Sequence, residues 1–183
     1  MKVIGNSKNV NDYIITIFCG TISTIIIGFL FFGFSIFNKQ NPSFQFPVFG
    51  IIGTISFALF KLKEFRYSIF ILSLLFLFEI IFTGEKYIVT HILFYIAMVL
   101  SILIYTKFFY ARLNNIKYSR FLVLASIISI SYVIVTIILG LLFKSDSINL
   151  FLFQNMPIGF LIGIGLGLGF ELSEYMLAII KNN

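Results

Sequence analysis

The sequence predicts an all-α integral membrane protein that crosses the bilayer six times. Of its 183 residues 60% are hydrophobic and only 11% are charged, whereas soluble domains carry roughly 25% charged residues. The mean hydropathy is +1.06. Several apolar stretches approach or exceed the roughly 20 residues that a helix needs to cross a hydrocarbon core of about 30 Å. We therefore expect a single transmembrane domain covering residues 1–183.

The first two spans are predicted at residues 12–37 and 46–62. The polar segment MKVIGNSKNVND precedes the first one. The apolar stretch that follows exceeds the roughly 7 to 15 residues of a signal-peptide core, so we expect this helix to be retained. The segment NKQNPSFQFP, which contains two prolines, separates the two spans. Such residues favour a turn.

The third and fourth spans are predicted at residues 67–83 and 87–111, joined by the short turn TGEK. The fifth and sixth are predicted at residues 120–143 and 156–180, and the charged and polar segment KSDS follows the fifth. The intervening SINLFLF, residues 147–153, is expected to lie in the membrane interface as a short amphipathic or re-entrant piece. We do not count it as a seventh span.

The positive charges predict that both chain ends face the cytoplasm. With six spans and a cytoplasmic N-terminus, ten of the 13 Lys and Arg residues fall on the inner side and three on the outer side. Cytoplasmic loops are enriched in these residues. The inner residues are Lys2, Lys8, Lys61, Lys63, Arg66, Lys107, Arg112, Lys117, Arg120 and Lys181, and the outer ones are Lys39, Lys86 and Lys144.

Charge and cysteine content argue against several function classes. The formal net charge is +6, but the basic residues lie in short clusters between apolar stretches, so we expect them to set orientation and not to bind nucleic acid. One cysteine, Cys19, cannot form an internal disulfide or a cysteine metal cluster. One histidine and one cysteine do not make a zinc site or a bis-histidine haem. No metal and no cofactor are expected.

Five glycines in the last span predict close helix packing on two faces. Glycine is a poor helix former, but in membrane helices it lets neighbouring backbones approach. Residues four apart lie on one side of a helix. One stripe comprises Gly159, Gly163 and Gly167, and Gly165 and Gly169 form a second stripe on roughly the opposite face. We expect the last helix to lie between two others.

Two acids end this glycine-rich segment. Glu171 continues the first stripe, and Glu174 follows three residues later. At a rise of 1.5 Å per residue, Glu171 lies about 21 Å from Pro157, in the inner half of the bilayer. Glu174 is nearer the inner interface and is expected to reach water. Intramembrane acids tend to mark ion, proton or substrate pathways, although Glu171 could equally be a structural carboxyl bonded to a neighbouring helix.

Glu79 and His91 form a second candidate pair on the third and fourth spans. Each lies about five residues from the TGEK turn, so both are expected roughly 7 Å inside the outer leaflet. An imidazole beside a carboxylate would be a titratable group open to the outside. The open alternative is that one or both side chains simply reach the interface.

Two function classes remain open at this point. In the first, the chain is a small transporter or channel-like protein, with a proton-coupled path that uses Glu79, His91, Glu171 and Glu174. In the second, it is a non-catalytic anchor or scaffold subunit of a larger membrane complex. An enzyme is not expected, because the sequence offers no nucleophile and base that would lie at the same depth in the membrane. The expected partners are the lipid bilayer and either a second copy or complex subunits packed on the last helix, in the cytoplasmic membrane of a prokaryote.

Overall fold

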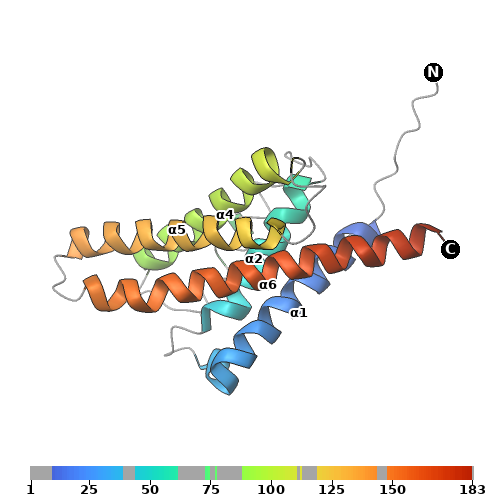
Figure 1. Ribbon diagram of the computed structural model, residues 1–183. Helices are drawn as coiled ribbons and strands as arrows, with labels where there is room; N and C mark the ends of the chain where they lie inside the picture. Colours follow the sequence, from blue (N-terminus) through green and yellow to red (C-terminus); the bar gives the residue numbers. More distant parts are fainter. Residues whose placement is uncertain are drawn as a thin grey trace.

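The described part of the chain is helical throughout most of its length (Figure 1). It contains no strand, so the prediction of an all-α protein is confirmed for these residues. The computed structural model describes residues 10–38, 44–61, 73–74, 77, 88–110, 112, 119–143 and 148–182.

The helices follow the apolar stretches of the sequence. Helix α1 is continued by the 3-10 helix η1, and α4 is continued by a π-helical turn, η4. Residue Gly33, where η1 begins, has a φ of 57°, which a glycine adopts without strain. The bounds are α1 Val10–Phe32, η1 Gly33–Phe37, α2 Gln45–Lys61, α4 Ile88–Ile104, η4 Tyr105–Phe109, α5 Ser119–Phe143 and α6 Ile148–Asn182.

Four of the six predicted spans correspond to helices that are long and apolar enough to cross a membrane. These are Asp12–Phe37, Val89–Phe109, Ser119–Phe143 and Asn155–Ile180. The second predicted span corresponds to Gln45–Lys61, which is apolar but only 17 residues long. Of the third, only residues 73, 74 and 77 are described, and these are helical. Six crossings and cytoplasmic termini therefore stay predictions.

The last helix is longer than the sequence suggested. Helix α6 has 35 residues and continues through Pro157, so from Ile148 onward the segment predicted at residues 147–153 is not a separate piece, and its place in the membrane interface stays a prediction. Pro157 cannot donate the backbone hydrogen bond that a helix would make to the carbonyl of residue 153. Beside it, the Ser129 hydroxyl of α5 donates to the Met156 carbonyl over 3.1 Å. At 1.5 Å per residue α6 is about 52 Å long, which exceeds the hydrocarbon core.

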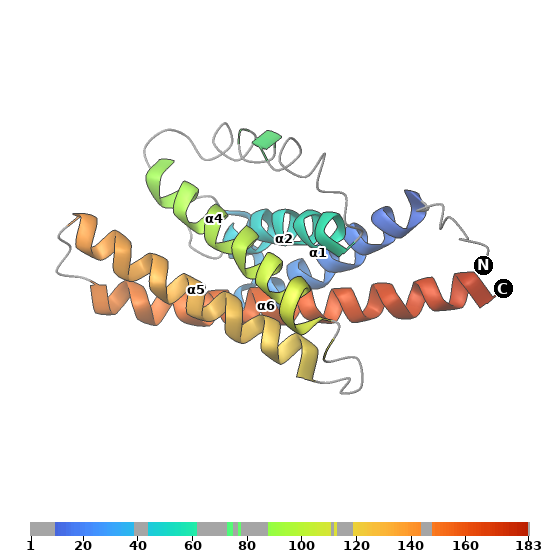
Figure 2. The ribbon, with the colours of Figure 1, turned by 90° about the horizontal axis from the view of Figure 1, so that it is seen from above.

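Helix α6 lies between α1 and α5, as both ribbon views indicate (Figures 1 and 2). Its glycines are the points of closest approach: a methyl group on Gly165 would lie 2.6 Å from the Thr24 Cα, and one on Gly167 would lie 2.6 Å from the Phe121 Cα. Neither backbone could approach a larger residue this closely. On the α5 side Gly159, Gly163 and Gly167 face Tyr132, Ala125 and Phe121, and on the α1 side Gly165 and Gly169 face Thr24 and Gly20.

Helix α2 packs beside α6 and runs in the same direction. Three α2 residues, four apart, each contact the α6 residue that lies 113 positions later in the chain. The Phe57 and Phe170 rings stack with centroids 3.7 Å apart and planes 8° apart. The other two pairs are Gly53 with Leu166 and Lys61 with Glu174. This register places the end of α2 beside Glu174.

The remaining contacts fix which helix ends lie together. Helices α1 and α5 both run antiparallel to α6, so α1 and α5 begin at the end of the bundle where α6 finishes. Helix α4 runs in the same direction as α2, because Phe94 contacts Phe49 and Tyr105 contacts Phe57. The last residues of α2 and the first residues of α4 therefore lie at opposite ends of the bundle.

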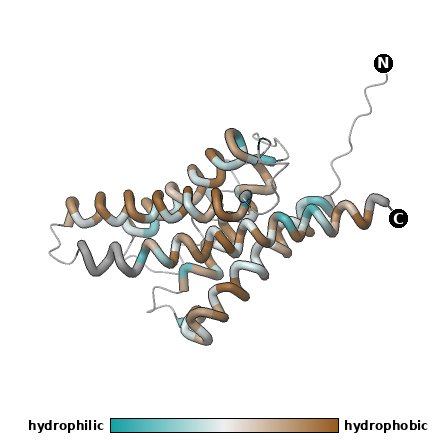
Figure 3. Tube along the Cα trace, in the orientation of Figure 1, coloured by the Kyte–Doolittle hydropathy of each residue, from teal (hydrophilic) through white to brown (hydrophobic). Residues whose placement is uncertain are grey.

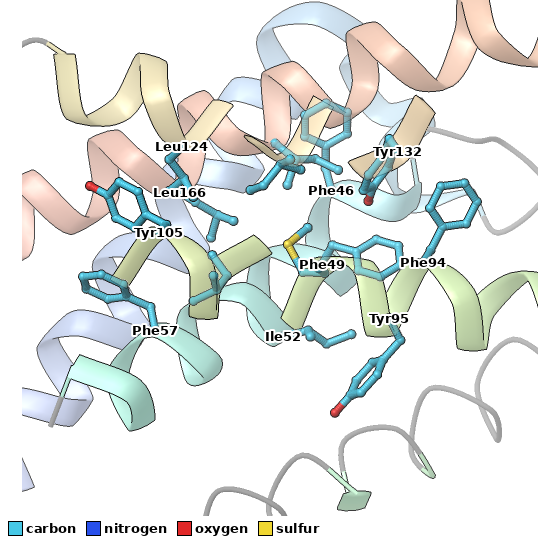
Figure 4. Packing of buried hydrophobic residues seen from close by; sticks show 14 of the residues in the cluster. Phe46, Phe49, Ile52, Phe57, Phe94, Tyr95, Tyr105, Leu124, Tyr132 and Leu166 are labelled. Carbon is cyan, nitrogen blue, oxygen red and sulfur yellow. The ribbon is translucent and has the colours of Figure 1, made fainter. Parts of the chain in front are cut away.

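A buried aromatic and aliphatic core joins these helices (Figure 4). Tyr132 of α5 lies against both Phe49 and Phe94, with ring centroids 6.0 Å and 4.7 Å away. The outer surface is also apolar: Leu30 and Leu141 are 71% exposed. Hydrophobic residues colour most of the helical trace (Figure 3). Large exposed apolar side chains on a helical bundle suit contact with lipid.

Candidate functional site

The main polar feature of the described helices is a group of four side chains, Lys61, Tyr110, Arg120 and Glu174, which we call the Glu174 cluster. The Lys61 Nζ lies 3.0 Å from the Glu174 Oε1, and the Arg120 Nη1 lies 2.8 Å from the Glu174 Oε2. The Tyr110 hydroxyl donates to the Glu174 Oε1. One carboxylate thus joins the ends of α2 and η4, the beginning of α5 and the C-terminal part of α6.

The cluster is neither fully buried nor freely solvated. The side chains of Lys61, Arg120 and Glu174 are 23%, 12% and 29% exposed. Ion pairs on a surface contribute about 0 to 1 kcal/mol, whereas removing one partner of a buried pair is much more costly, because it leaves an uncompensated charge. With two cations around one carboxylate, the cluster carries an excess positive charge.

Aromatic rings lie next to the two cations of the Glu174 cluster. The Lys61 Nζ lies 5.5 Å from the Phe57 ring centroid and 5.2 Å from that of Tyr110, and the Arg120 guanidinium lies 5.4 Å from the Tyr110 centroid. Cations at such distances are attracted to the faces of aromatic rings. Phe57 also stacks on Phe170, so the charged cluster is fixed to the core of the bundle.

The π-helical turn η4 explains how Tyr110 reaches the cluster. In an α-helix, residues five apart point in directions about 140° apart. The wider turn, closed by the Tyr110 N–H bond to the Tyr105 carbonyl at 2.9 Å, brings both rings to the Phe57 side of α4. The ring centroid of Tyr110 lies 5.4 Å from that of Phe57, and the ring centroid of Tyr105 lies 6.3 Å from it. Single π-helical turns occur frequently at functional sites.

Glu171 lies one turn deeper on α6 than Glu174 and has a different environment. It is partly buried, and its Oε1 is buried with no hydrogen-bond partner among the described residues. Arg120 lies near enough to act on its charge. Tyr105, which is 2% exposed, lies within electrostatic range of Arg120, Glu174 and Glu171. Arg120 is therefore within electrostatic range of both acids, and its hydrogen bond is to Glu174.

The structure places the other predicted site residues elsewhere. His91 lies in the first turn of α4 and is partly exposed. It precedes Tyr105 by 14 residues, which corresponds to about 21 Å along the helix, so it lies toward the end of the bundle opposite the Glu174 cluster. Glu79 lies outside the described residues, and its pairing with His91 stays a prediction.

Sequence reasoning missed three members of the cluster. Glu174 was expected to reach water, but although it is partly exposed it has three partners. Lys61 and Arg120 were considered only as orientation signals, and Tyr110 was not assigned to a site. Their positions in the sequence could have predicted the cluster, because each of the three lies near the end of a predicted span on the side of the membrane where Glu174 was expected.

In the part of the chain that the structure describes, no three of the His, Cys, Asp and Glu side chains are grouped as a metal site would require. Comparison with protein-family models, with curated proteins and with solved structures finds no match to this chain.

Proposed function

We propose that the chain is a small multi-pass membrane transport protein, of the transporter or channel-like kind, in which Glu171 carries a proton at the cytoplasmic side. The observation that carries this proposal is the contrast between two acids one helical turn apart. Glu174 has three partners, whereas one Glu171 oxygen is buried without any among the described residues. A charged carboxylate in such a position costs much free energy, whereas the protonated, neutral carboxyl costs less, so this environment favours proton binding by Glu171.

The location of the acids supports the same proposal. Both lie in the membrane-length segment Asn155–Ile180, and the cations around them come from helix ends. The membrane we propose is the cytoplasmic membrane of a prokaryote, with the Glu174 cluster on its inner side, because Lys and Arg concentrate on that side.

The alternative, a scaffold subunit in a larger complex, draws its sequence support from the glycine stripes of the last helix. In the described structure one stripe contacts α5 and the other contacts α1 of the same chain. A partner or a second copy would instead have to pack on exposed residues such as Tyr175, which is 67% exposed, or Ile180, which is 54% exposed. The glycines therefore no longer favour the scaffold.

Transport is tested with the purified protein in liposomes that contain a pH-sensitive dye. Proton movement is followed under an imposed pH gradient and membrane potential, while alkali cations and then amino acids are added outside. We expect proton flux above that of protein-free liposomes, and we expect Glu171→Gln to reduce it to that background. Asp12→Asn is the matched control, since it makes the same carboxyl-to-amide change at the start of α1.

Two results would count against the proposal. Unchanged flux in a folded Glu171→Gln protein would remove the assigned role of this acid. A wild-type protein that is silent in liposomes but co-purifies with defined membrane subunits after gentle extraction would favour the scaffold.

A further inference from the structure

We propose that the Glu174 cluster binds the phosphate of an anionic phospholipid headgroup, and that Lys61 is the residue that donates hydrogen bonds to it. The inference goes beyond transport, because it needs only that the chain lies in a membrane and stands whether or not Glu171 carries a proton. The chemistry that is recognised is a phosphate with a net negative charge. The proposed source of this phosphate is a lipid in the leaflet next to the cluster.

The first support is the charge of the cluster. Lys61 and Arg120 lie 3.0 Å and 2.8 Å from the single carboxylate of Glu174, so the cluster keeps one positive charge in excess. Basic groups between membrane helices on the cytoplasmic side bind anionic lipid headgroups. A headgroup with one net negative charge would neutralise this excess, whereas a zwitterionic headgroup would not.

The second support is that Lys61 can reach a ligand outside the bundle. An ammonium group has three N–H donors, and among the described residues the one hydrogen-bond partner of Lys61 is the Glu174 Oε1. The Lys61 side chain is 23% exposed. The rings of Phe57 and Tyr110, whose centroids lie 5.5 Å and 5.2 Å from the Lys61 Nζ, attract the ammonium and fix its position.

The third support is the depth of the cluster along the bundle. Helix α6 runs from Ile148 to Asn182. At 1.5 Å per residue, Glu174 lies about 39 Å from the start of α6, and the helix continues for about 12 Å beyond it. The ribbon views show α1 and α6 continuing past α2 and α5 at this end (Figures 1 and 2). Because a bilayer with its headgroups is about 40 to 45 Å thick, a helix that starts in the outer headgroups places Glu174 among the inner ones.

The fourth support is the apolar surface on the membrane side of the cluster. Ile104 and Phe108, which precede Tyr110 in the chain, are 41% and 47% exposed, and Leu172, which precedes Glu174, is 49% exposed. Because α4 and α6 both run toward the cluster, these side chains lie closer to the bilayer centre than the charges do. A lipid can therefore place its phosphate at the cluster and its acyl chains along apolar side chains, as it does in its own leaflet.

Lipid binding is tested by native mass spectrometry of the purified protein in a mild detergent. The protein is mixed with equal amounts of phosphatidylglycerol, which is anionic, and phosphatidylcholine, which is zwitterionic. The two lipids differ in mass, so the ratio in which they occupy the complex with one bound lipid measures the preference. Lys107→Gln is the matched control for Lys61→Gln, because it removes the same charge from an exposed residue of η4 whose recorded contact is with Phe108.

We expect the wild-type protein to prefer phosphatidylglycerol by about fivefold, the usual effect of one basic residue near an anionic membrane surface. Lys61→Gln leaves one cation on the Glu174 carboxylate, so the cluster becomes neutral and the preference should disappear. Lys61→Arg should keep the preference, and Lys107→Gln should change it by less than about twofold. Glu174→Gln raises the excess charge and should increase the preference, which a purely structural role of the cluster would not do.

Equal binding of the two lipids to the wild-type protein, or an equal loss of preference in Lys107→Gln and Lys61→Gln, would overturn the proposal. A competition experiment adds an excess of glycerol 3-phosphate, which has the phosphate but no acyl chains. Retention of the bound lipid supports a lipid site, and its displacement would overturn the lipid assignment in favour of a soluble phosphate. Size-exclusion profiles establish that the variants are folded, and Glu174→Gln provides an independent answer if Lys61→Gln is not. Proton flux enters none of these measurements, so failure of the lipid site is distinguishable from failure of the proposed function.

Discussion

At the scale of single residues, two acids of the same type have different hydrogen-bond environments. Glu174 is compensated by two cations and a phenol, and Glu171, one turn deeper, has a buried oxygen without a bond among the residues described. Position along the helix accounts for the difference, because Lys61 and Tyr110 bond the acid at position 174. Proximity in sequence therefore does not make the two carboxyls equivalent.

We expect Glu174→Gln to lower the stability of the protein by about 1 to 3 kcal/mol, between the values for surface and buried ion pairs. The substitution removes the negative charge that lies between Lys61 and Arg120. The measurement is loss of the monodisperse size-exclusion peak on heating in detergent. Lys107→Gln, which removes an exposed cation in η4, is the control and should change stability by less than about 0.5 kcal/mol. Equal midpoints for the two variants would mean that the cluster contributes little.

At the scale of helices, glycine positions decide how closely α6 approaches its neighbours. We expect Gly165→Ala to destabilise the bundle by about 1 to 3 kcal/mol, the usual cost of overpacking. The added methyl would lie 2.6 Å from the Thr24 Cα, which is backbone and cannot rotate away. The same thermal assay measures the effect. Leu168→Ala removes a partly lipid-facing side chain from the same helix and should cost less; a larger loss for Leu168→Ala would contradict the role given to Gly165.

Helix positions could be predicted from this sequence better than helix ends. The apolar stretches predicted six spans, and four of these correspond to helices of membrane length among the described residues, because length and lack of charge are local properties. The break expected before Pro157 is absent, and the packing of α6 on α5 there, including the Ser129 bond to the Met156 carbonyl, is a tertiary contact that no local pattern reveals. The Glu174 cluster was missed for the same reason: its four members come from four segments. The π-helical turn that aligns Tyr105 with Tyr110 also has no signal in the sequence.

At the scale of the whole molecule, helix directions determine which ends lie together. The beginnings of α1 and α5 and the ends of α2, η4 and α6 gather at the end that carries the Glu174 cluster. The end of η1 and the end of α5 lie toward the opposite end. We propose that this end faces the cytoplasm, because the basic residues are in excess on the predicted inner side.

This arrangement makes a labelling prediction that needs no knowledge of the transported solute. In a Cys19→Ala background, single cysteines at the exposed positions Arg112 and Tyr175 should react with a membrane-impermeant thiol reagent in inside-out vesicles and stay protected in intact cells. A cysteine at exposed Asn38, which follows η1, should show the reverse pattern. If Arg112 and Asn38 were labelled from the same side, the two ends of the bundle would not lie on opposite sides of the bilayer. The inner assignment of Glu171 would then lose its basis.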